Sequence, residues 1–127
     1  MMLWTLLQVA IGGAVGASAR YLTGVGVLRL VGFQAIPLGV MVANVLGSFA
    51  MGALVVYLGQ RGLGHLNALL MTGFLGGYTT FSAFSLETWT LFERGQMGLV
   101  AAYVLMSVGL SLLGLALGVV LMRAALA

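Results

Sequence analysis

Long apolar runs separated by short polar connections make up almost the whole chain. Predominantly apolar stretches cover residues 3–28, 37–58, 65–92 and 96–122. Each is about 20 residues or longer, which is enough for a helix rising about 1.5 Å per residue to cross a hydrocarbon core of about 30 Å. The pattern predicts an all-α membrane protein with residues 1–127 in a single four-helix transmembrane domain.

Composition agrees with a membrane location and leaves little for catalysis. Apolar residues make up 62% of the chain and charged residues 6%, with a mean hydropathy of +1.19, so a soluble globule would lack polar surface. The five arginines are scattered and form no nucleic-acid-binding patch. One histidine, two glutamates and no cysteine provide no metal cluster, carboxylate pair or activated nucleophile, so an enzyme is not expected.

The third run contains a stretch that disfavours a continuous helix. Gly76-Gly77-Tyr78-Thr79-Thr80 combines a glycine pair with β-branched threonines, both of which weaken a helix. Backbone released from helical hydrogen bonds at membrane depth must face protein, a cavity or an ion. The stretch therefore predicts a broken third helix, which is either a binding site or a kink packed against a neighbouring helix.

Two other spans carry polar residues on one helical face. Asn44 is followed by Ser48 in the second span, and Tyr103, Ser107 and Ser111 repeat every fourth residue in the last. Counted at about 1.5 Å per residue from the same membrane face, Asn44 lies roughly 10 Å deep, Phe84 roughly 13 Å and Ser107 roughly 16 Å. This shared depth predicts a translocation path, although Asn44 alone could equally be a helix–helix hydrogen bond.

The first run ends in a charged residue and contains small residues at regular spacing. Gly12 and Gly16 predict a face for close packing against another helix. Arg20 is expected to snorkel towards the far interface, where it could pair with Glu87 or share a polar rim with it. Ala17-Ser18-Ala19 resembles a signal-peptidase site, but no basic residue precedes the run, which favours a membrane span over a cleaved signal.

Arginines give almost no orientation signal. Arg61 and Arg123 fall on the side of the N-terminus, against Arg29 and Arg94 on the other, with Arg20 as an uncertain third. Such a near-tie is typical of insertion in both orientations, and an antiparallel homodimer would then resemble the inverted repeats of larger transporters. In a chain this short, a near-tie can also arise by chance.

The run from Gly73 to Ser85 resembles the Fluc (CrcB-type) fluoride channels of bacteria. The likeness includes Gly-Gly-x-Thr-Thr-Phe-Ser-x-Phe, Asn44 in its Val-Ala-Asn-Val-Leu-Gly context, and the Gly-Ala-x-x-Arg run that ends at Arg20. It covers essentially the whole chain. The resemblance implies a passive, selective fluoride channel that exports the ion across the cytoplasmic membrane, with two pores in an antiparallel, dual-topology homodimer.

The resemblance also implies residue roles. Fluoride would pass along Asn44, Phe81, Phe84, Tyr103, Ser107 and Ser111, with Arg20 near a vestibule. Backbone carbonyls of Gly76 and Thr79 from both subunits would hold a structural Na⁺ at the dimer axis. Ala83 and Val40 depart from the family pattern, because threonine or another hydroxyl residue is common at these positions. The loss of these donors concerns details of the polar track and not the resemblance as a whole.

Two other functions fit four short spans. A small dual-topology transporter coupled to protons would need a membrane-embedded carboxylate in the first helix, and none precedes Arg20. A structural membrane subunit would explain the small-residue faces, but it would not explain why Asn44, Phe81 and Ser107 share one depth.

Overall fold

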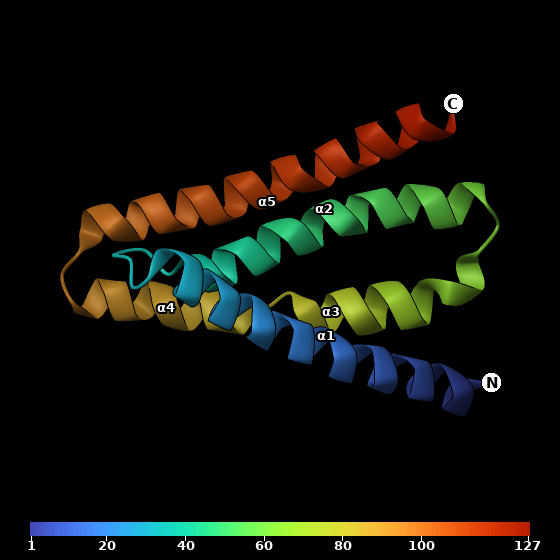
Figure 1. Cartoon of the computed structure of the whole chain (residues 1–127), viewed down its shortest axis with the longest axis horizontal. Helices are drawn as coiled ribbons and strands as arrows, with labels where there is room; N and C mark the ends of the chain where they lie inside the picture. Colours follow the sequence, from blue (N-terminus) through green and yellow to red (C-terminus); the bar gives the residue numbers. More distant parts are fainter.

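The computed structural model describes all residues, 1–127, and is entirely helical. Three helices are long and apolar enough to cross a membrane: α1 (Met2–Val31), α2 (Leu38–Gln60) and α5 (Met97–Leu126). Both termini lie at one end of the molecule, together with the connection after α2 (Figure 1). The prediction of an all-helical protein with several membrane-spanning helices is confirmed.

Between α2 and α5, the chain forms a series of shorter helical elements. A 3₁₀ turn, η1 (Gly64–Leu66), leads into a π-helix, η2 (Ala68–Leu75), and then α3 (Gly76–Tyr78) and α4 (Phe81–Glu93) follow. Thr79 and Thr80 between α3 and α4 are extended, with ψ of 156° and 120°. The residues predicted as the third span, 65–92, therefore comprise two helical stretches joined end to end by an extended pair.

Local sequence accounts for several helix ends. Gly32 ends α1 with φ of 69°, a backbone conformation that favours glycine, and its N–H donates to the Leu28 carbonyl at 2.9 Å. Pro37 precedes α2, where its missing N–H costs no helical hydrogen bond. At the start of α4, the Thr80 hydroxyl accepts from the Ala83 N–H at 3.2 Å and caps the helix.

Glycines let two pairs of helices approach closely. A side chain at Gly12 or Gly16 of α1 would clash with backbone oxygens of η2, and one at Gly118 of α5 would clash with the Phe49 carbonyl in α2. The predicted packing role of Gly12 and Gly16 is thus confirmed. Figure 1 shows the same pairing, with α2 running beside α5 and α1 crossing the η2–α3 segment.

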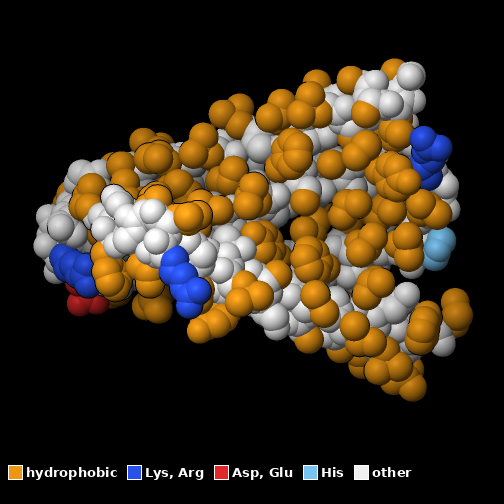
Figure 2. All heavy atoms as spheres, in the orientation of Figure 1, with side chains coloured by type: hydrophobic (Ala, Val, Ile, Leu, Met, Phe, Trp, Pro, Cys, Tyr) orange, Lys and Arg blue, Asp and Glu red, His pale blue; other side chains and the backbone are white.

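The outer surface is apolar, as a lipid environment requires. Hydrophobic side chains cover most of the visible face, and its middle carries no charged side chain (Figure 2). Only 15 of 127 residues are buried in the single chain, so most of its apolar surface needs lipid or a partner to cover it.

Candidate functional site

A groove of about 300 Å³ lies where α2, α4 and α5 meet the extended Thr79–Thr80 pair. We call it the central groove. Among its lining residues are five of the six predicted pore residues, namely Asn44, Phe81, Phe84, Ser107 and Ser111. Three helices that are separate in sequence thus bring these side chains to one surface.

Asn44 holds the interruption between α3 and α4 in place. Its side-chain amide nitrogen donates to the Thr80 carbonyl at 3.0 Å, and its amide oxygen accepts from the Thr80 N–H at 2.8 Å. Both backbone groups of Thr80 are thereby satisfied at a point where no helix supplies partners. The amide has two N–H groups, so one donor of Asn44 remains for another acceptor in the groove.

The two phenylalanines differ in their surroundings. Phe84 is buried, and its ring centroid lies 5.4 Å from that of Phe81 and 5.3 Å from that of Tyr103. Phe81 is 77% exposed, so most of this ring is left uncovered by the chain. The edge of an aromatic ring is positively polarised, so a ring edge that faces the groove can contact an anion.

Ser107 carries a buried hydroxyl close to that of Tyr103, one turn away on α5. It is 5% exposed, and its Oγ has no hydrogen-bond partner. Buried hydroxyls are normally paired, because leaving one unpaired costs about 1–3 kcal/mol. Ser107 lines the central groove together with the partly buried Ser111 one turn away, so an acceptor in the groove could take its donor.

Tyr103 does not line the central groove. It is fully buried in a cluster with Met41, Phe84 and Leu91, and its hydroxyl donates to the Glu87 carboxylate at 2.6 Å. Tyr103 sits one helical turn from Ser107, between the groove and Glu87. Tyr103 therefore lies on the helical face of Ser107, as its spacing predicted, but it bonds Glu87, a contact that the sequence did not predict. Its role in the pore stays a prediction.

The proposed pairing of Arg20 with Glu87 is wrong for the protomer. The Arg20 Nε donates to the Gly77 carbonyl at 3.1 Å, whereas Glu87 accepts from Tyr103. The physical reason is that α1 crosses the η2–α3 segment, which brings the long Arg20 side chain within reach of an uncapped carbonyl. Arg20 thus contacts the interruption of the third span and does not line the central groove.

A second contact ties α1 to the same region. The hydroxyls of Thr23 and Tyr78 lie 2.8 Å apart, one turn beyond the Arg20 contact. The carbonyls of Gly76 and Thr79, which were expected to bind Na⁺, lack the kind of side-chain partner that Gly77 has in Arg20. No hydrogen bond outside the helical ladders reaches either of them.

Sequence reasoning did not assign Thr80 or Met51 to the site, and both line the central groove, as does Ser48. Ser48 was recognised on the face of Asn44 but given no role. Thr80 could have been found, since a threonine between a weak helix and an apolar helix start is a typical N-cap. Met51 carries no signal, because methionine is common in any membrane helix.

Comparison with known proteins gives one consistent family. The model of the family described as "CrcB-like protein, Camphor Resistance (CrcB)" matches residues 7–119. A protein of Ruegeria sp. (strain TM1040) is 58% identical over 98% of this chain and 99% of its own length. A protein of Cereibacter sphaeroides (strain ATCC 17029 / ATH 2.4.9) is 62% identical over 96% and 97%. One from Paracoccus denitrificans (strain Pd 1222) is 49% identical over 94% of both. All three are named fluoride-specific ion channel FluC.

Proposed function

Because this chain belongs to the CrcB-like family, we propose that it is a passive fluoride channel of the bacterial inner membrane and not an enzyme. Its long apolar helices fit a multi-pass protein of that membrane. The observation that carries the proposal is the central groove, in which Asn44, Ser107 and Phe81 from three helices share one cavity.

The groove has the chemistry that a small anion needs. Fluoride only accepts hydrogen bonds, so a dry path must replace its hydration water with donors. The spare amide N–H of Asn44, the unpaired Ser107 hydroxyl and the Ser111 hydroxyl are such donors. No arginine lines the groove, which suits conduction, because an ion bound too tightly cannot leave.

The pore is completed by a second copy in the opposite orientation. Polar groups at membrane depth are costly when they face lipid, and the central groove lies open along one side of the protomer with Phe81 exposed beside it. An antiparallel partner would cover both grooves at once and yield two pores per dimer. The near-equal distribution of arginines between the two sides supports insertion in both orientations.

A structural Na⁺ at the dimer axis would bind backbone oxygens at the interruption between α3 and α4. Arg20 and Asn44 occupy the carbonyls of Gly77 and Thr80, which leaves those of Gly76 and Thr79 without such partners. Two carbonyls from each subunit would supply hard oxygen ligands for a cation, whose charge would offset their dipoles. Arg20, beside these carbonyls, would border a vestibule.

Fluoride efflux from liposomes tests the proposal directly. Purified protein should release fluoride passively, without proton coupling, when a K⁺ ionophore balances charge. Phe81→Ile or Phe84→Ile should slow efflux at least about tenfold while leaving the dimer intact, because an aliphatic side chain has no polarised edge. Phe92→Ile, in the same helix but outside the groove, should keep the wild-type rate.

Three results would point elsewhere. Proton-coupled movement of organic cations would favour a small transporter, and no flux from a well-folded dimer would favour a structural subunit. Wild-type rates in both groove variants would contradict the pore assignment, even if fluoride passes.

A further inference from the structure

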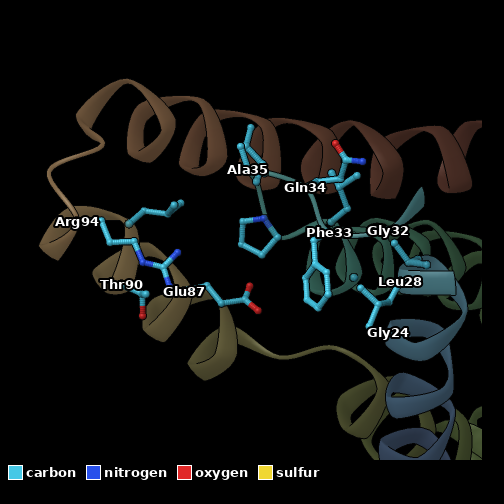
Figure 3. A pocket seen from close by; sticks show the side chains of 15 residues that line it. Gly24, Leu28, Gly32, Phe33, Gln34, Ala35, Glu87, Thr90 and Arg94 are labelled. Atoms are coloured by element: carbon cyan, nitrogen blue, oxygen red, sulfur yellow. The ribbon is translucent and has the colours of Figure 1, made fainter. Parts of the chain in front are cut away.

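A second cavity, of about 400 Å³, opens at the end of the molecule opposite the termini. We call it the end cavity. The C-terminal part of α1, the connection over residues 32–37 and the last turns of α4 form its walls (Figure 3). Much of the wall is apolar, but Glu87, Thr90 and Arg94 line it from α4 and the turn after it.

The two charged residues of the end cavity do not neutralise each other directly. The Glu87 carboxylate accepts from Tyr103, and neither a salt bridge nor a side-chain hydrogen bond joins it to Arg94. Figure 3 shows the Arg94 side chain reaching from the end of α4 towards the cavity, on the side where the Glu87 carboxylate lies. Arg94 is exposed, so its charge acts on the open part of the cavity.

The end cavity is linked to the central groove by polar groups. Ser107 lines the groove, and Tyr103 lies one turn before it on α5. The Tyr103 hydroxyl donates to Glu87, which lines the end cavity. An anion that leaves the groove along this line meets a carboxylate. Coulomb repulsion from an ionised carboxylate within a few ångströms would deplete anions there, unless a positive charge compensates it.

We propose that Arg94 collects anions at the end cavity and offsets the charge of Glu87, which makes this cavity a mouth of the path. The inference rests on the proposed fluoride channel and assigns a role to a residue outside the pore. Arg94 does not bind the ion within the pore. It raises the local fluoride concentration from an exposed position, so its effect depends on ionic strength.

Fluoride efflux at fixed, low fluoride concentration tests this role. Arg94→Gln should slow efflux about threefold to tenfold at roughly 10 mM ionic strength and less than about twofold at roughly 500 mM, because salt screens an exposed charge. Impermeant ions should set the ionic strength. Arg94→Lys should keep most of the rate, and saturating fluoride should restore it in Arg94→Gln.

Arg29→Gln is the matched control. Arg29 lies in the last turn of α1 at the same end of the molecule, but does not line the end cavity. Arg29→Gln should lower the efflux rate much less than Arg94→Gln does. Equal salt-dependent losses in the two variants would show a general surface-charge effect and overturn the assignment.

A double variant tests the link to Glu87. Glu87→Gln removes the negative charge and keeps an oxygen that accepts from Tyr103, so Arg94→Gln should cost less than about twofold in this background. An undiminished loss would refute charge compensation. Wild-type protein without fluoride flux would contradict the proposed function and this inference together. Normal wild-type flux with an unchanged Arg94→Gln rate would contradict this inference alone.

Discussion

At the residue scale, Asn44 combines a structural and a chemical task. Its side-chain amide satisfies both the N–H and the carbonyl of Thr80, and it keeps one N–H for the central groove. A single side chain therefore fixes the backbone from which α4 starts and presents a donor beside Phe81. Structure and conduction are expected to fail together when this side chain is shortened.

Asn44→Ala should reduce fluoride efflux at least about tenfold and lower the stability of the protein. Two backbone groups would lose their partners, at about 1–3 kcal/mol for each group left unsatisfied. Efflux from liposomes and thermal unfolding in detergent measure the two effects. Asn67→Ala, an exposed asparagine outside the groove, serves as the control and should change neither.

Arg20 should matter for stability through its hydrogen bond to the Gly77 carbonyl. Arg20→Gln removes a charge-assisted hydrogen bond of about 1.5–3 kcal/mol and should lower the unfolding temperature by several degrees. Differential scanning fluorimetry checks this expectation. Arg123→Gln removes the same charge near the C-terminus and should leave the temperature unchanged; equal stability of both variants would contradict a structural role for Arg20.

At the element scale, glycines set the distance between helices. α2 and α5 lie close enough that Gly118 faces the Phe49 carbonyl and Gly52 faces that of Leu115. This contact holds the Asn44 and Ser107 faces against each other, since they belong to the same pair of helices. Packing between α2 and α5 thus determines the width of the central groove.

Gly118→Ala should destabilise the protein by about 1–3 kcal/mol and slow fluoride efflux, because the added methyl group would force α2 and α5 apart. The matched control is Gly109→Ala in the same helix, where an added methyl group meets open space. Urea titration of the detergent-solubilised protein compares the two. Gly109→Ala should keep or raise the stability, because alanine favours a helix more than glycine does; similar losses in both variants would contradict a packing role for Gly118.

At the scale of the whole molecule, the proposed antiparallel partner would cover the exposed Phe81 and the open side of the central groove. If two antiparallel copies form the pores, variants forced into one orientation should be inactive alone. Added lysines in the connection at residues 61–64, or at Gln34 and Gln96 on the other side, would impose opposite orientations. Each set should abolish fluoride resistance in cells, and co-expression of both should restore it. Activity of either set alone would contradict the antiparallel dimer.

The sequence determined those features that depend on local composition and length. Runs of about 20 apolar residues require membrane-spanning helices whatever their neighbours. Gly12 and Gly16 were predicted to allow close packing because small residues four apart form one face of a helix. Asn44, Phe81 and Ser107 were predicted to share a depth, since helix rise alone sets depth.

Only the tertiary structure decided which side chains meet. The depth of a residue does not say which way its side chain points around the helix axis. Spans that are apolar on all sides do not reveal how each helix is rotated. Arg20 was therefore paired with Glu87 on depth, whereas the crossing of α1 brings it to Gly77 and the packing of α4 on α5 gives Glu87 to Tyr103. Hydrogen-bond partners a few ångströms apart depend on helix rotation and crossing, which emerge only when all helices pack together.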